Sequence, residues 1–374
     1  MSLAVSQAPN HALEVAMKAA EAAHLRYTSD ETPGIRRKRS GTAFVYSALD
    51  GKRITDEEEL ARIRKLAVPP AYEDVWICAD DRGHLQATGR DARGRKQYRY
   101  HADWRAVRDE SKYGRMIELG RILPKVRKTV QTRLDEKHPT KDWVLSLVVH
   151  LLDTTLIRVG NEEYARENRS YGLTTLLAKH VALHNGAVKL AFRGKSGVEH
   201  QVTVSDRRVA RALQRCMQLP GRELFQYVDD NGDRHTVDST DVNEHLRRLT
   251  GADITAKDYR TWAGSVLAMK ALREQKWSSA TDAKRKLVET YKQVASRLRN
   301  TPAVCKKCYV HPHVVQRYLA GSLFEIPPSN ARQFLSADEV AFLNMLSSSA
   351  AAEPRSVARA PRRRRPSATA ARAA

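Results

Sequence analysis

One tyrosine and four cationic or amide side chains, spread over separate segments, are of the types that could rearrange a phosphodiester. Such a reaction needs a nucleophile that attacks phosphorus, donors that stabilise charge on the non-bridging oxygens, and an acid for the leaving 5′ oxygen. Arginine suits the second task because its rigid fork grips two oxygens and stays protonated, and lysine suits the third because a positive neighbourhood lowers its pKa. The chain supplies these types in the order Arg158, Lys195, Arg260, Asn300 and Tyr309. If the arginines supply the positive charge, the reaction needs no metal ion or other cofactor.

Both arginines lie at the ends of predicted helices. Residues 141–157 are apolar nearly all round, which predicts a helix central to a core, and Arg158 follows it directly. Arg260, in Lys-Asp-Tyr-Arg-Thr-Trp, starts a helix predicted over 260–274. An arginine at a helix end is more often a surface charge, so neither position is informative alone.

The lysine is expected at the tip of a β-hairpin. Apolar and polar residues alternate over 188–192 and again over 201–204, with the glycine-bounded turn 193–197 between them. Lys195 occupies that turn, where a lysine is ordinarily just solvated. Asn300 precedes Tyr309 by nine residues, and a tyrosine in a helical pattern is ordinarily packed rather than catalytic.

The remaining patterns predict an α+β chain with two domains and two extensions. A helix over 12–25 forms an N-terminal extension of residues 1–28. The β-rich stretches 42–46, 75–78 and 84–88 predict a small β domain that ends at residue 101. Further helices are expected at 112–136, 206–217, 241–249 and 281–299, so residues 102–346 form a larger, mostly helical domain. The Ser-, Ala-, Pro- and Arg-rich segment 347–374 is expected to be a disordered tail.

Taken together and in order, these motifs resemble the type IB DNA topoisomerases of the small bacterial, poxvirus-like class, over roughly residues 30 to 320. The segments that resemble the family are Leu156–Tyr164, Tyr171–Leu176, the Lys195 turn, Lys257–Trp262, Asn300–Pro312, and Gly89–His101 with Trp104. No single motif is specific, but the ordered combination is. The family belongs to the tyrosine recombinase and topoisomerase IB catalytic fold.

The resemblance implies a role for each member of the set. Tyr309 would attack to form a 3′-phosphotyrosyl link and release a 5′-hydroxyl, with Arg158 and Arg260 on the phosphate oxygens and Lys195 as the general acid. Many relatives have histidine where this chain has Asn300, although the bacterial members resemble this chain in using asparagine. An amide donates a hydrogen bond but cannot transfer a proton. The link conserves the phosphodiester energy, so religation would need no ATP.

The charge of the chain favours a polyanionic partner. The formal net charge is +22, and because seven arginines and no acid follow Glu353, +15 belongs to residues 1–353. Double-stranded DNA is the expected partner, although a generally adhesive basic protein would have the same charge. The predicted DNA contacts, each of which could instead belong to a solvated surface, are Arg90, Arg93, Arg95, Lys96, Tyr98, Tyr100 and Lys257.

The cysteines and the hydropathy indicate where the protein works. Four cysteines are too few for a disulfide scaffold and suit a reducing cytoplasm. No run of 18 apolar residues predicts a membrane helix, and the N-terminus does not read as a secretory signal, so a cytoplasmic protein on the bacterial nucleoid is expected. Cys305, Cys308, His311 and His313 suggest zinc, but their spacing is too tight for the usual two-pair site.

Two other functions share part of this pattern. A tyrosine recombinase uses the same order of catalytic types, but usually has an all-helical domain where residues 42–88 are β-rich here. A non-catalytic DNA-binding protein would not need Lys195, Tyr309 and both arginines together. We expect a monomer, because one tyrosine cuts one strand.

Overall fold

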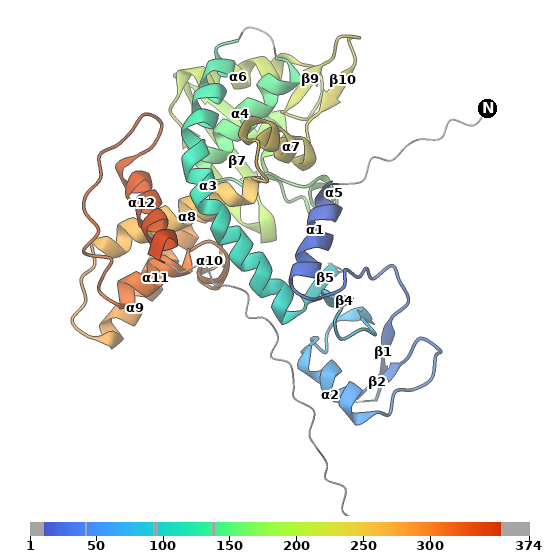
Figure 1. Cartoon of the computed structure of the whole chain (residues 1–374). Helices are drawn as coiled ribbons and strands as arrows, with labels where there is room; N and C mark the ends of the chain where they lie inside the picture. Colours follow the sequence, from blue (N-terminus) through green and yellow to red (C-terminus); the bar gives the residue numbers. More distant parts are fainter. Residues whose placement is uncertain (1–10, 42, 93, 95, 137–138, 353–374) are drawn as a thin grey trace, which may run out of the picture. The chain divides into compact units, whose positions relative to one another are not determined.

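The computed structural model describes residues 11–41, 43–92, 94, 96–136 and 139–352, and its elements are drawn in Figure 1. The chain divides into two compact units, Met1–Gly114 and Arg115–Ala374, and the division falls inside the helix α3 (Ala102–Leu134). A small sheet in the first unit and many helices in the second confirm the α+β class.

The N-terminal unit is built on a five-stranded antiparallel sheet of order β2-β1-β3-β4-β5. Its strands and helices are α1 (His11–Ala22), β1 (Ile35–Ser40), β2 (Ala43–Ser47), α2 (Glu57–Lys65), β3 (Glu73–Ile77), β4 (Leu85–Arg90) and β5 (Lys96–Tyr100). A small core of Ile35, Ile63, Val75, Ile77 and Ala87 fixes α2 on the sheet. The helix near the N-terminus and the strands expected at 42–46, 75–78 and 84–88 are therefore confirmed, apart from Thr42, which is not among the described residues.

Two strands of this sheet were not predicted. β1 has the sequence Ile-Arg-Arg-Lys-Arg-Ser, in which only Ile35 is buried, so the alternation that marks a strand is absent. β5 lies in the basic segment for which the sequence predicts only a surface facing DNA. Its pairing with β4, from Arg90↔Lys96 to Leu85↔Tyr100, comes from backbone hydrogen bonds that side-chain types do not reveal.

The second unit is organised around α4 (Lys141–Thr155), which is buried over most of its length as predicted and packs on α7, α8 and β9. Around it lie α5 (Glu162–Asn168), the three-stranded sheet β6 (Val181–His184), β7 (Ala187–Arg193) and β8 (Glu199–Val204), α6 (Arg207–Gln218), the two-stranded sheet β9 (Gln226–Val228) and β10 (Arg234–Thr236), α7 (Ser239–Thr250), α8 (Ala256–Arg273), α9 (Ala280–Leu298), α10 (Pro302–Cys308), α11 (Pro312–Leu319) and α12 (Ala337–Ala352). The predicted hairpin is confirmed: β7 and β8 pair antiparallel, and Lys195 begins the turn between them.

Three helix boundaries differ from the prediction by four residues or more. α3 starts at Ala102 rather than 112, in a charged stretch without apolar periodicity. α8 starts at Ala256 rather than 260, because the Asp258 carboxylate accepts hydrogen bonds from the backbone and hydroxyl of Thr255 and caps the helix. α12 continues to Ala352, into the segment expected to be unfolded from 347, because its last residues include a run of alanines with high helix propensity. The rest of that segment, residues 353–374, lies outside the described residues.

A partly buried ion-pair cluster holds α12 on the unit. Arg127 on α3 donates to Asp153 at 2.7 and 2.9 Å and to Glu339 of α12 at 3.0 and 2.8 Å. Trp262 of α8 donates its indole N–H to the same Glu339 at 3.0 Å. Burial raises the pKa of Glu339, but the hydrogen bonds and charge of Arg127 outweigh it and hold that pKa below its usual value.

We therefore expect Glu339→Ala to lower the free energy of unfolding by about 3 kcal/mol, because it leaves a partly buried arginine and a buried indole short of an acceptor. Urea unfolding followed by circular dichroism measures the loss. The contribution should be complete above the unfolded-state pKa of glutamate, about 4.3, and lost as the pH falls through the lower folded-state value. Asp338→Ala is the matched control, because its pair with Lys270 is partly exposed and should contribute less than about 1 kcal/mol. Equal losses for the two variants would contradict the prediction.

Candidate active site

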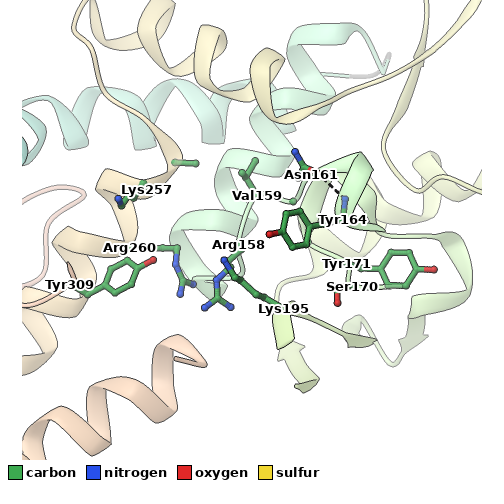
Figure 2. Close-up of a pocket in the computed structure, with 13 residues that line it drawn as sticks. Arg158, Val159, Asn161, Tyr164, Ser170, Tyr171, Lys195, Lys257, Arg260 and Tyr309 are labelled. Carbon is green, nitrogen blue, oxygen red and sulfur yellow. Dashed lines mark hydrogen bonds between the residues drawn. The ribbon is translucent and has the colours of Figure 1, made fainter. Parts of the chain in front are cut away.

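A pocket of about 310 Å³ in the second unit gathers residues from four separate segments. Figure 2 shows Arg158, Lys195, Lys257, Arg260 and Tyr309 around it. Four of the side chains that line this pocket are cationic, and none is a carboxylate. The pocket is therefore suited to an anion.

Arg158 enters the pocket because α4 ends abruptly. Leu156 caps the helix in the left-handed conformation, with φ 58°, and turns the chain out of the helix two residues before the arginine. The Arg158 guanidinium donates to the Asn300 side-chain oxygen and, at 3.2 Å, to the Arg299 carbonyl. Burial, followed by the charge of Arg260, lowers the pKa of Arg158. The charge of a bound anion would offset both the lost solvation and the repulsion.

Arg260 is held more rigidly, because it is 3% exposed and its guanidinium is braced by two backbone carbonyls. One terminal nitrogen donates to the Leu156 carbonyl and the other donates to the Leu298 carbonyl at 2.7 Å. The guanidinium carbon lies 5.3 Å from the centre of the Tyr309 ring. The α8 helix thus sets one positive charge beside the tyrosine in a fixed orientation.

Two buried donors next to this pair have no partner among the described residues: Arg260 Nε and Asn300 Nδ2. A buried N–H without an acceptor costs free energy, and native proteins rarely retain one without a reason. An anionic oxygen bound near Arg158 would supply the missing acceptor. Together with the cationic lining of the pocket, these two donors indicate a site built for an anionic ligand.

Tyr309 ends the short helix α10 and rests on α8 through its backbone. Its carbonyl lies 3.1 Å from the Ser265 hydroxyl oxygen, which in turn accepts from the His311 backbone N–H at 3.0 Å. A Cβ on Gly264 would lie 2.7 Å from the Tyr309 carbonyl oxygen, so only glycine permits this approach. The sequence interpretation missed Gly264 and Ser265. Glycine inside a helical pattern was the available signal, since it usually marks a close packing contact.

Lys195 lines the pocket from the hairpin turn, where Ser196 and Gly197 both adopt left-handed conformations. Its Nζ lies 5.9 Å from the centre of the Tyr164 ring. Lys257, whose role the sequence left open, lines the same pocket from the first turn of α8. The structure therefore brings together all five predicted catalytic residues, four as lining residues and Asn300 through its hydrogen bond to Arg158.

Two of the four residues that suggested zinc, Cys305 and His311, have structural environments. Cys305 is fully buried on α10, and burial raises the pKa of its thiol to about 11. The His311 side chain caps α11 by accepting from the His313 backbone N–H at 3.1 Å. Burial thus favours the thiol form of Cys305 over the reactive thiolate.

The other predicted DNA contacts belong to the N-terminal unit. Tyr98 is 48% exposed and stacks on Tyr100 with ring centres 6.1 Å apart. Lys96 pairs with Asp30 at 2.7 Å, and Arg90 lies 3.6 Å from Asp74. Both cations are thus partly neutralised by acids of their own unit. Arg93 and Arg95 were predicted as contacts too, but lie outside the described residues.

Among the described residues, no helix combines the length and the hydrophobicity that a membrane span requires.

The model of a family described as eukaryotic DNA topoisomerase I, catalytic core, matches residues 101–322. A second, described as bacterial DNA topoisomerase IB, N-terminal domain, matches residues 43–91.

Similar whole proteins come from viruses. The DNA topoisomerase 1B of Acanthamoeba polyphaga mimivirus is 32% identical over 305 residues, which cover 79% of this chain and 91% of the relative. The DNA topoisomerase 1 of Rabbit fibroma virus (strain Kasza) is 26% identical over 293 residues, 73% of this chain and 88% of the relative. The DNA topoisomerase 1B of Vaccinia virus (strain Copenhagen) is 23% identical over 248 residues, 66% of this chain and 75% of the relative.

Proposed function

The chain belongs to the type IB DNA topoisomerases, and we propose that it relaxes supercoiled duplex DNA by cutting one strand, allowing rotation, and resealing the nick. The Tyr309 hydroxyl attacks phosphorus, forms a 3′-phosphotyrosyl link and releases a 5′-hydroxyl. The observation that supports this most directly is the cationic pocket in which the Tyr309 ring lies beside Arg260. Because the phosphotyrosyl link keeps the energy of the phosphodiester, the reverse attack by the 5′-hydroxyl needs no ATP.

The scissile phosphate would bind between the two arginines. Arg158 and Arg260 stabilise the negative charge that develops on the non-bridging oxygens, and their braced positions mean that little reorganisation is needed during the reaction. Arg260 also lies beside the ring of the attacking tyrosine, where its positive charge favours the developing phenolate. Asn300 positions Arg158 with its side-chain oxygen and offers its unpartnered N–H to the phosphate.

The leaving 5′ oxygen requires a proton, and Lys195 is the group that we assign to this step. It lines the pocket beside two arginines, whose positive charge favours release of an ammonium proton. Lys257, at the same pocket, adds a further positive charge for the DNA backbone. These residues supply the charge stabilisation and the proton transfer without a metal ion.

The remaining parts of the chain extend this function. We propose that residues 1–101 form a DNA-clamping domain and residues 102–346 the catalytic domain. The residues of the first domain that we expect to contact the DNA backbone are Arg90, Arg93, Arg95, Lys96, Tyr98 and Tyr100. The arginine-rich tail beyond residue 353 would add non-specific affinity for DNA through its charge. We propose that the enzyme acts as a monomer on the bacterial nucleoid.

The function is tested by incubating the protein with supercoiled plasmid in EDTA without ATP. Stepwise relaxation is the expected result, seen as a ladder of topoisomers on an agarose gel. Retarded but still supercoiled plasmid would mean a DNA-binding protein without the activity. Exchange of strands between two substrates at a defined site would mean a recombinase.

Asn300 allows a separate test of how the phosphate is held. We expect Asn300→Ala to slow cleavage of a DNA duplex by about tenfold, the value of one lost hydrogen bond of about 1.4 kcal/mol. Asn300→Asp keeps an acceptor for Arg158 but replaces the N–H with negative charge, so it should be slower than Asn300→Ala. Single-turnover cleavage rates measure both. An aspartate variant as fast as the native enzyme would show that Asn300 serves only to orient Arg158.

A further inference from the structure

A histidine that the proposed mechanism does not use lies directly beneath the turn that presents Lys195. His200 is on β8, is 4% exposed, and pairs across the sheet with Phe192 of β7. The two rings stack with centres 4.7 Å apart and planes at 15°. Neither ring nitrogen has a partner among the described residues. A buried imidazole in this state is unfavourable for stability, so its retention needs another reason.

The ring supports the backbone of Gly194, the residue before Lys195. A Cβ on Gly194 would lie 2.5 Å from His200 Nε2 and 2.6 Å from its Cδ2. The backbone of Gly194, with φ −98°, does not itself require glycine. Position 194 therefore requires glycine because any side chain would prevent the close approach of the backbone to the His200 ring. Because the ring is buried and stacked on Phe192, it cannot move aside cheaply to admit a methyl group.

The turn above the ring is short and closed by its own hydrogen bonds. Gly194 N–H donates to the Val198 carbonyl at 2.8 Å, and Gly197 N–H donates to the Gly194 carbonyl at 3.0 Å. A shift of Gly194 therefore moves the whole turn, and Lys195 with it. A proton donor must lie within hydrogen-bond reach of the atom it protonates, so small shifts have large effects on the rate.

We propose that His200 is a positioning residue. Its ring packs against Gly194, fixes the position of the turn 194–197, and thereby places Lys195 in the pocket. The inference rests on the proposed role of Lys195 as general acid. An uncharged ring suits this task, because it supports the turn without adding a positive charge to a site that already holds Arg158 and Arg260. Burial, together with the charges of Arg299, Arg158 and Arg260, lowers the pKa of His200 to about 4. The ring is therefore uncharged at neutral pH.

The test compares two DNA duplexes that differ in the leaving atom at the cleavage site: the natural 5′ oxygen, and a 5′-bridging sulfur whose departure needs no proton. Gly194→Ala should slow cleavage of the oxygen duplex at least tenfold, yet cleave the sulfur duplex within about twofold of the native rate, because only proton donation depends on Lys195. His200→Ala, which removes the support without adding bulk, should show the same selective loss to a smaller degree. The double variant should cleave the oxygen duplex at least threefold faster than Gly194→Ala, because the space left by the ring admits the methyl group.

Two controls separate positioning from general damage. Gly264→Ala crowds the Tyr309 carbonyl rather than the Lys195 turn, so it should be slow on both duplexes. Gln201→Ala changes the exposed neighbour of His200 on β8 and should match the native enzyme on both. Thermal melting and non-covalent DNA binding verify that each variant folds. If Gly194→Ala fails to fold, the selective loss in His200→Ala decides the question.

Failure of the inference about His200 and failure of the proposed role of Lys195 give different results. If Lys195→Ala is rescued by sulfur but Gly194→Ala and His200→Ala are not, His200 does not act through Lys195, and the inference is overturned alone. A double variant slower than Gly194→Ala would overturn the inference too, because it contradicts the contact between the two residues. If Lys195→Ala is itself not rescued, the general-acid role fails, and the inference falls with it.

Discussion

Tyr309→Phe is expected to abolish covalent capture of DNA, with cleavage slowed by at least about 10⁴-fold, because the only atom it removes is the proposed nucleophile. The phenyl ring keeps its place beside Arg260, and the backbone of residue 309 keeps its contact with Ser265. Non-covalent binding to a DNA duplex should therefore change little. Transfer of a labelled strand to the protein, seen on a denaturing gel, measures the first effect, and a gel shift measures the second.

Tyr291→Phe is the matched control. Tyr291 is buried on α9, and it is not among the residues that line the pocket. Removal of its hydroxyl should leave strand transfer within about twofold of native, as expected for a substitution outside the pocket. Plasmid relaxation by Tyr309→Phe would refute the assignment of the nucleophile and the proposed mechanism with it.

The second large effect concerns Lys195. Lys195→Ala should slow cleavage of an ordinary duplex by about 10²- to 10⁴-fold, the usual contribution of a positioned general acid. A 5′-bridging sulfur leaves without a proton, so the same variant should cleave that duplex at close to the native rate. Single-turnover rates on the two duplexes give the ratio directly.

Lys257→Ala tests whether rescue by the bridging sulfur is specific to the loss of Lys195. Lys257 lines the same pocket, but we assign it an electrostatic role toward the DNA backbone rather than proton transfer. Loss of Lys257 should slow cleavage of both duplexes to the same extent. If sulfur rescued Lys257→Ala and not Lys195→Ala, the two lysines would have to exchange roles.

Several features of the protein follow from its sequence alone, because their signals are local. The apolar residues of 141–157 predict a buried helix, and α4 is one. The alternation around 193–197 predicts the hairpin, and β7 and β8 form it. The ordered Arg, Lys, Arg, Asn and Tyr set predicted residues that the structure brings together, because the four segments that carry them are each recognisable in the sequence. Their catalytic roles remain predictions until the variants are measured.

Other features were decided only by tertiary contacts. The hydrogen bond from Arg158 to Asn300 joins residues 142 positions apart, and no pattern within either segment specifies it. The packing of Tyr309 on Gly264, like that of Gly194 on His200, depends on a side chain being absent where two segments meet. The strand β5 depends on backbone pairing with β4, which its charged side chains conceal. Sequence patterns report which faces are apolar and where the chain turns, whereas the distances within the site arise only when separate elements pack together.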